Sequence, residues 1–228
     1  MPAEPPAPRL VLATRNTHKI AELSRILAAA GAGVTLIGLE SFHDAPEVAE
    51  TGLTFADNAL LKARAIAAHT GLPAVADDSG LCVDALHGMP GVFSARWSGK
   101  HGDDQANLDL VLGQVCDVSE RGAQFVCVAA LALPGARPGA LPGALPGAAD
   151  DGGARREWTM TGVLAGSLTR APRGSNGFGY DPIFLPDGAS RTTAEMTPDE
   201  KDAISHRGRA FRALAPVVAA RVIRRRPA

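Results

Sequence analysis

Two adjacent carboxylates, Asp77 and Asp78, directly follow an apolar run at residues 73–76 and precede Ser79-Gly80. The apolar run predicts a short buried strand, and the end of such a strand is where α/β proteins place their chemistry. Neighbouring side chains of a strand point to opposite faces, so both acids reach one ion only if the chain bends after the strand. We expect Ser79-Gly80 to supply that bend, which predicts a metal or acid–base site.

The same four residues are also typical of an ordinary acidic turn, because Asp, Ser and Gly are the residues that turns prefer. Two further segments follow closely, residues 88–91 (Gly-Met-Pro-Gly) and residues 94–96 (Ser-Ala-Arg). A surface hairpin rarely needs so much specified backbone. Taken alone, the acidic stretch leaves both the turn and the site open.

A polar loop, residues 14–19 (Thr-Arg-Asn-Thr-His-Lys), joins the apolar run at residues 9–14 to a segment with helical spacing that starts at Ile20. The free N–H groups and the positive dipole end of a helix N-terminus attract anions, so the loop predicts a phosphate site. The alternative is that Asn16 or Thr17 only caps the helix and Lys19 is solvated.

A glycine-rich loop at residues 174–182 carries Phe178 and Tyr180 in a chain with few aromatic residues. Glycines beside Phe178 let the backbone approach a flat ligand, and an aromatic face is a common platform for a nucleobase. Alternatively, the two rings cover a core edge. After a helix start at Thr197, His206 is by itself more typical of a surface or capping histidine than of a ligand contact.

The remaining chain predicts an α/β protein. Early strand–helix alternation and a late hairpin favour a central mixed sheet flanked by helices, with two lobes and a cleft between them lined by Asp78 and Phe178. Thr54 and Asp57 form a capping pair for a helix. Further strands are expected at residues 34–39, 124–133 and 157–163, a helix at residues 103–115, and a last helix with a kink or restart at Pro216.

The run from residue 76 to 81 (Ala-Asp-Asp-Ser-Gly-Leu), with the Gly, Pro-Gly and Ser-Ala-Arg residues after it, resembles the signature of the inosine triphosphate pyrophosphatase family. The resemblance extends in matching order from Leu10 to Leu214. It includes the loop at residues 14–19, the Glu-Thr-Gly at residues 50–52, Phe-Gly-Tyr-Asp at residues 178–181 and Ser-His-Arg at residues 205–207.

Members of that family cleave deaminated purine nucleoside triphosphates (ITP, dITP, XTP) to the monophosphate and pyrophosphate, which cleanses the nucleotide pool. The resemblance implies that Asp78 is the general base and a metal ligand, that Glu50 is a metal-binding carboxylate, and that Asp77 supports them. Mg²⁺ is the expected ion, because it takes one or two carboxylates plus water and phosphate oxygens. A homodimer is also implied.

The resemblance further implies a set of substrate-binding residues. For Lys62, a solvated helix lysine is the alternative, and Arg15 departs from the small residue that the family often carries. The implied set is Thr14, Arg15, Asn16, Thr17, His18, Lys19, Lys62, Ser79, Phe178, Gly179, Tyr180, Asp181, Lys201, His206 and Arg207.

Composition bounds the function. The 228 residues, 46% of them apolar, suffice for one pyrophosphatase domain, expected at residues 9–223, and the net charge of −1 argues against a nucleic-acid partner. Three widely spaced cysteines indicate neither disulfides nor a thiolate metal site, which fits the cytoplasm. No stretch predicts a membrane span.

We expect a disordered leader at residues 1–8, a Pro/Gly/Ala-rich loop insertion at residues 134–153 and a basic tail at residues 224–228.

Three alternatives stay open. A related nucleotide pyrophosphatase such as the Maf-type enzymes has a similar architecture, although the segments at residues 178–181 and 205–207 argue against it. A non-catalytic nucleotide-binding protein needs the lysines but not three acids, and it releases no pyrophosphate. A nucleic-acid-binding module lacks the basic excess that such proteins show.

Overall fold

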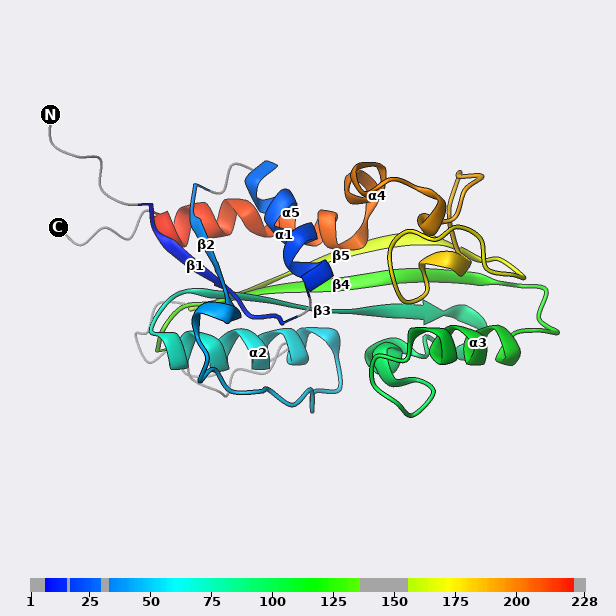
Figure 1. The fold of residues 1–228 in the computed structure, drawn as a ribbon, viewed down its shortest axis with the longest axis horizontal. Coiled ribbons are helices and arrows are strands. Elements are labelled where there is room, and N and C mark those ends of the chain that lie inside the picture. The colour runs from blue at the N-terminus through cyan, green and yellow to red at the C-terminus, as the bar shows by residue number, and fades with distance from the viewer. Residues whose placement is uncertain (1–6, 16, 30–32, 136–155, 224–228) are drawn as a thin grey trace, which may run out of the picture. The chain divides into compact units, whose positions relative to one another are not determined.

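The computed structural model describes residues 7–15, 17–29, 33–135 and 156–223 (Figure 1). Most of the expected leader, most of the expected insertion and the expected tail lie outside these residues. The chain forms two compact units. The first comprises Met1–Asp78, Val128–Met160 and Ala210–Ala228, and the second comprises Ser79–Cys127 and Thr161–Arg209.

Six strands form one mixed sheet, as expected from the sequence. β1 pairs in parallel with both β2 and β3, whereas β5 and β6 are antiparallel. The strand order is β2-β1-β3-β4-β5-β6. The strands are β1 (Arg9–Leu12), β2 (Thr35–Gly38), β3 (Ala74–Val83), β4 (Gly122–Ala132), β5 (Glu157–Leu168) and β6 (Phe184–Pro186).

Helices flank the sheet within each unit. In the first unit, α2 (Phe55–Thr70) lies on one face, and α1 (Thr17–Ala29) and the C-terminal part of α5 (His206–Val218) lie on the other (Figure 1). In the second unit, α3 (Asp104–Gln114) and α4 (Pro198–Ile204) lie on opposite faces. Each unit has its own apolar core: α2 packs on β1, β3 and β4 in the first, and α3 packs on β3, β4 and β5 in the second.

The late hairpin is also confirmed. β4 and β5 are neighbours in the sheet, and the N–H of Leu133 donates to the carbonyl of Arg156 at 2.9 Å. At the opposite end of the two strands, the N–H of Leu168 donates to the carbonyl of Arg121 at 2.8 Å. Because the end of one strand pairs with the start of the other in both places, the strands run antiparallel.

Local signals place the helix ends correctly. The Thr54 hydroxyl accepts from the N–H of Asp57, and the Asp57 carboxylate accepts from the N–H of Thr54, so the expected pair is a full capping box.

Pro216 does not restart the last helix: α5 continues through it, and a π-helical turn, Ala219–Ile223, follows. Among the described residues, no helix combines the length and the apolar character that a membrane span requires.

Candidate active site

Asp77 and Asp78 lie inside β3, not after it. The strand runs from Ala74 to Val83, so the prediction that it ends at residue 76 and bends at Ser79-Gly80 is wrong. A Cβ on Gly80 would stand 2.4 Å from the carbonyl oxygen of Gly91, which shows that this glycine permits close packing of two segments instead of forming a turn. The alternation of a strand therefore directs the two carboxylates to opposite faces.

Both acids are nevertheless buried, with 2% of Asp77 and 6% of Asp78 exposed. Asp78 faces α2, because the amide of Asn58 donates to its Oδ2 at 3.0 Å. The ammonium of Lys62, one turn further along the same helix, lies 3.7 Å from its Oδ1. The ordinary acidic turn is thus excluded, since a turn would leave these carboxylates in water.

Lys62 connects Asp78 to Glu50. Its Nζ donates to Oε1 of Glu50 at 2.6 Å, and its side chain is only 15% exposed. Lys62 is therefore not a solvated helix lysine. Burial lowers the pKa of Lys62, but the negative charges of Asp78, Asp77 and Glu50 together with the hydrogen bond to Glu50 outweigh burial and raise it. The ammonium stays charged at neutral pH, as a group that neutralises phosphates must.

The acids do not form a ready-made cage for a metal. Within the described part of the chain, no group of three or more Asp, Glu, His or Cys side chains is arranged to hold an ion. Glu50 and Asp78 do converge on one cation, the Lys62 ammonium. Two hard carboxylates at one cationic position fit Mg²⁺, which fills its other positions with water and substrate phosphate oxygens.

The loop expected to bind phosphate lies between β1 and the start of α1, as predicted. The Arg15 guanidinium donates to the carbonyl of Ala45 at 2.8 Å, so in this structure it braces a neighbouring loop. Thr14 lies in the same loop, half-buried. Asn16 and the side chains of Thr17, His18 and Lys19 lie outside the described part of the chain, and their phosphate contacts stay a prediction.

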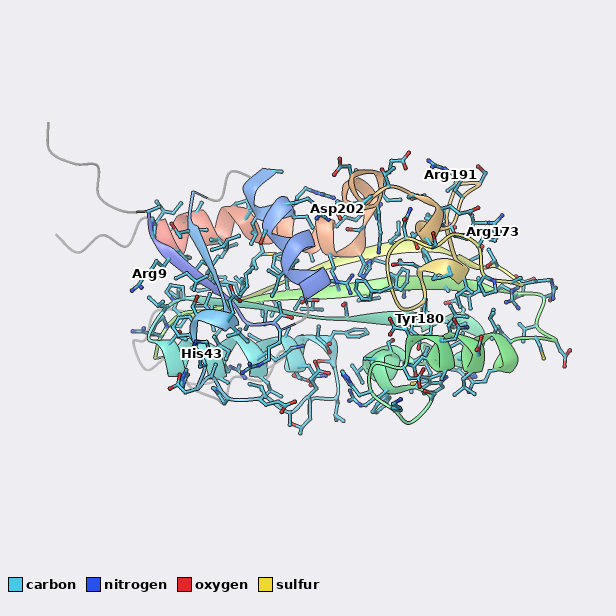
Figure 2. The ribbon with its side chains drawn as sticks, viewed as in Figure 1. Arg9, His43, Arg173, Tyr180, Arg191 and Asp202 are labelled. Atoms are coloured by element: carbon cyan, nitrogen blue, oxygen red, sulfur yellow. The ribbon has the colours of Figure 1, made fainter. Side chains whose placement is uncertain are left out.

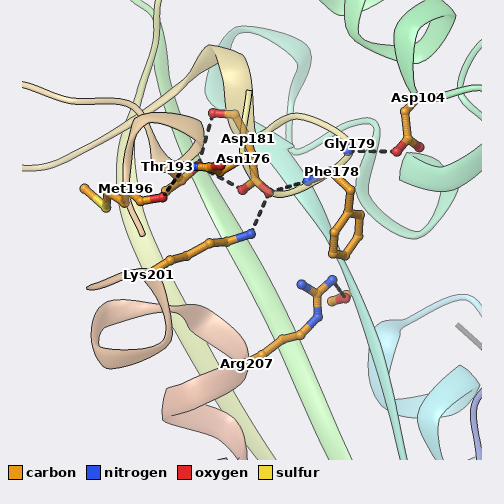
Figure 3. Close-up of polar contacts among 10 residues, drawn as sticks. Asp104, Asn176, Phe178, Gly179, Asp181, Thr193, Met196, Lys201 and Arg207 are labelled. Atoms are coloured by element: carbon orange, nitrogen blue, oxygen red, sulfur yellow. Dashed lines mark hydrogen bonds and ion pairs between the residues drawn. The ribbon is translucent and has the colours of Figure 1, made fainter. Parts of the chain in front are cut away.

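The second unit holds the segment expected to bind the base, and Asp181 organises it. This carboxylate, 2% exposed, accepts from the N–H of Phe178 at 2.8 Å, from Lys201 at 2.5 Å and from the Thr193 hydroxyl at 2.9 Å (Figure 3). A Cβ on Gly177 would stand only 2.1 Å from Asp181 Oδ2, so this tight turn requires glycine.

Two cations converge on the Phe178 ring. Nζ of Lys201 lies 5.4 Å and Cζ of Arg207 lies 5.0 Å from the ring centroid (Figure 3). Arg207 also donates to the hydroxyl of Ser79 at 2.9 Å. Such cation–π contacts stabilise the ring by roughly 0.5–2 kcal/mol each and fix a flat apolar surface beside groups that only donate hydrogen bonds.

The loop around Phe178 is fastened from two further sides. The N–H of Gly179 donates to the Asp104 carboxylate at 2.8 Å. Tyr180 is labelled in Figure 2, and its buried hydroxyl donates to the carbonyl of Ser94 at 2.8 Å. Burial, with a smaller effect of the Asp104 charge, raises the pKa of Tyr180. The Tyr180 ring thus belongs to the apolar core of this unit, which agrees with the alternative that this ring covers a core edge.

His206 is neither a surface nor a capping histidine. Its ring is 3% exposed and stacks on Phe125, with 4.8 Å between the centroids and 13° between the planes. Its neighbour Arg207 is also buried, at 6% exposed. Arg173 and Arg191, labelled in Figure 2, are exposed: Arg173 Nε lies 3.7 Å from Oε2 of Glu195, and Arg191 donates to the carboxylate of Glu200 in α4 at 2.8 Å.

Two residues that the sequence did not indicate contact the predicted site residues. Asn58 binds Asp78, and its spacing of four residues from Lys62 on a helix was the available signal, since such residues share a face. Asp104 binds Gly179, which lies 75 positions away, and no local pattern indicates that contact.

In the first unit of this α/β fold a partly buried lysine lies between two acids, and in the second an aromatic ring lies beside two buried cations. The chain belongs to the Ham1 family, which matches residues 10–217.

Named relatives agree with this assignment. The chain is 58% identical over 212 residues to a dITP/XTP pyrophosphatase of Streptomyces coelicolor, which covers 92% of this chain and 96% of the relative. A dITP/XTP pyrophosphatase of Mycobacteroides abscessus is 51% identical over 213 residues, covering 92% and 94%.

Solved structures show the same fold. The structure of a HAM1 protein from Coxiella burnetii, 41% identical, superposes with a TM-score of 0.78 and covers 93% of this chain and 98% of its own. The Staphylococcus aureus Ham1 protein, 33% identical, superposes with a TM-score of 0.76 and the same coverage. The resemblance identified from the sequence is therefore confirmed.

Proposed function

We propose that this protein hydrolyses deaminated purine nucleoside triphosphates, namely ITP, dITP and XTP, to the nucleoside monophosphate and pyrophosphate. The observation that carries the proposal is the partly buried Glu50–Lys62–Asp78 cluster in a chain 58% identical to a dITP/XTP pyrophosphatase. A cluster of two acids and a charged lysine suits cleavage of a polyphosphate, because catalysis of that reaction depends on positioning and charge neutralisation.

In the proposed reaction, a water oxygen attacks the α-phosphorus and Asp78 accepts the proton of that water. The bond between the α-phosphorus and the bridging oxygen breaks, and pyrophosphate leaves with the electron pair. Lys62, together with Lys19 of the phosphate loop, balances the charge that develops on pyrophosphate. Glu50 and Asp78 would hold Mg²⁺, which would supply Lewis acidity and neutralise phosphate charge. Asp77, directed to the opposite face of β3, would support them through its negative charge, which raises the pKa of Lys62.

Base selectivity is proposed to arise in the second unit. Hypoxanthine and xanthine present an acceptor at O6, whereas adenine presents a donor at N6. Lys201 and Arg207, the cations beside Phe178, can only donate, so adenine would set donor against donor. Unsatisfied groups of this kind cost about 1–3 kcal/mol each, so two of them give roughly hundredfold discrimination or more.

Guanine shares O6 and N1–H with hypoxanthine, so its rejection must act on the 2-amino group, through crowding or the lack of an acceptor. We further propose a homodimer and a cytoplasmic location. The location is supported by the three cysteines, Cys82, Cys116 and Cys127, none of which forms a disulfide.

A panel of nucleoside triphosphates with Mg²⁺ tests the proposal, with pyrophosphate and monophosphate as separate readouts. We expect ITP, dITP and XTP to be cleaved, and ATP and GTP to have kcat/KM values lower by at least about a hundredfold. Binding of ITP without pyrophosphate release would instead identify a non-catalytic nucleotide-binding protein. Comparable kcat/KM for GTP and ITP would contradict the proposed base pocket.

A further inference from the structure

Asn58 is a fully buried polar residue, 0% exposed, in the first turn of α2. Both ends of its side-chain amide are hydrogen-bonded. The carbonyl oxygen Oδ1 accepts from the backbone N–H of Gly52 at 2.7 Å, and Nδ2 donates to Oδ2 of Asp78 at 3.0 Å. Asn58 therefore joins the segment that follows Glu50 to the carboxylate proposed as the base.

The amide can take only one orientation in this network. A backbone N–H is always a donor, so the side chain must turn its carbonyl oxygen toward Gly52. The NH₂ group is then directed at Asp78, whose Oδ2 must act as an acceptor. The short distance to Gly52 is specific to glycine, because a Cβ there would stand 2.7 Å from Asn58 Oδ1 and 2.5 Å from the Cβ of Asp57.

The two oxygens of Asp78 consequently have different surroundings. Oδ2 meets the neutral amide of Asn58, while Oδ1 lies 3.7 Å from the Lys62 ammonium, which is itself bonded to Glu50. Asn58 and Lys62 stand four residues apart on one face of α2, and each links the Glu50–Gly52 segment to Asp78. Asn58 and Lys62 together therefore determine how the Asp78 carboxylate is rotated about its Cβ–Cγ bond.

We propose that Asn58 is a positioning residue for the hydrolysis. By engaging Oδ2, it fixes the plane of the Asp78 carboxylate and directs Oδ1 to the side where Lys62 and Glu50 meet. This inference rests on the proposed function and adds a residue to it. A misplacement of about 1 Å in a catalytic group lowers turnover on the order of a hundredfold, so the orientation of Asp78 should control kcat.

A purely structural asparagine would behave differently, and the chain contains a matched example. Asn107 occupies the fourth position of α3, as Asn58 occupies the fourth position of α2, and is 1% exposed. Its Oδ1 also accepts a backbone N–H, that of Ser98, at 2.7 Å. Its Nδ2 makes no hydrogen bond within the described part of the chain, so Asn107 braces a loop without touching the proposed base.

The test compares Asn58→Leu with Asn107→Leu, using thermal unfolding, kcat and KM for ITP per folded molecule, and ITP affinity by calorimetry. Both variants are expected to lose stability, since each removes a buried hydrogen bond to a backbone N–H. Only Asn58→Leu should lose kcat, by about a hundredfold, with KM within roughly threefold of wild type. Asn58→Ser, which keeps a polar group too short to reach both partners, should show the same loss if the leucine variant does not fold.

Two failures are distinguishable. If wild type cleaves ITP and both Asn58 variants keep kcat within threefold of Asn107→Leu, Asn58 is only a structural residue and the inference is overturned. If wild type releases no pyrophosphate from any nucleotide of the panel, the proposed function itself fails, and the inference that rests on it falls with it.

Discussion

Replacing the buried Asp78 with asparagine removes one negative charge from the Glu50–Lys62–Asp78 cluster and keeps the size of the side chain. The carbonyl oxygen of the new amide can still accept from Asn58. Its NH₂ group then replaces Oδ1 and faces the Lys62 ammonium, which lies 3.7 Å from Oδ1 in this structure. Asp78→Asn therefore removes the proposed base and sets a donor against a cation that cannot accept.

The expected loss is large in turnover and small in affinity. A positioned general base contributes about 10²- to 10⁴-fold, equivalent to roughly 3–5 kcal/mol of transition-state stabilisation. Lys62 keeps its 2.6 Å contact with Glu50, so the lysine remains in place for phosphate binding. Removal of a negative charge favours binding of the anionic nucleotide and removal of a proposed Mg²⁺ ligand opposes it, so ITP affinity should change little.

Pyrophosphate release from ITP with Mg²⁺, measured beside calorimetric ITP binding, provides the assay, and thermal unfolding confirms that the variant is folded. Asp109→Asn is the control, because Asp109 is an exposed acid on α3 whose contact is with Gln105 of the same helix. Activity of Asp78→Asn within about tenfold of wild type, a difference of roughly 1.4 kcal/mol, would refute the assignment of Asp78 as the base.

Three further predictions follow from other parts of the structure. Arg207→Ala removes a cation from beside Phe178 and should lower kcat/KM for ITP at least about tenfold while changing ATP little; an equal loss for both nucleotides would contradict a role in base selection. Arg121→Met removes three hydrogen bonds to backbone carbonyls and should lower the free energy of unfolding by about 1–3 kcal/mol in denaturant titrations; no change would show that these bonds contribute little. Hydrogen bonds from Arg191 and from the Thr197 backbone lower the pKa of Glu200 from 4.5 to about 2. The contribution of ionised Glu200 to the free energy of unfolding is therefore fully present above pH 4.5 and is lost as the pH falls through about 2. The melting temperatures of wild type and Glu200→Gln should therefore differ at pH 6 and converge near pH 2, and a pH-independent gap would contradict this linkage.

The sequence predicts what depends on near neighbours in the chain. The Thr54–Asp57 capping box needs only residues three positions apart, and it is present as expected. The helix N-terminus after residue 16 and the β4–β5 hairpin are likewise signalled by local apolar runs and the segment between them.

Long-range contacts explain the errors. Gly80 looked like a turn residue, but its role is set by the Gly91 carbonyl and Ser94, which pack against it from elsewhere in the chain. For Lys62 the sequence left both a triphosphate contact and a solvated lysine open, and the positions of Glu50 and Asp78 beside it exclude the solvated alternative. Tyr180 is anchored to a carbonyl 86 positions away. The residue types were visible in the sequence, but their partners depend on the fold.

Hydrolysis of ITP in ¹⁸O-labelled water tests the central claim most directly, because it reports which phosphorus the water attacks. If Asp78 activates a water toward the α-phosphorus, mass spectrometry should find one labelled oxygen in the monophosphate and none in the pyrophosphate. Label in pyrophosphate, or release of orthophosphate with the nucleoside diphosphate, would contradict the proposed chemistry of the Glu50–Lys62–Asp78 cluster.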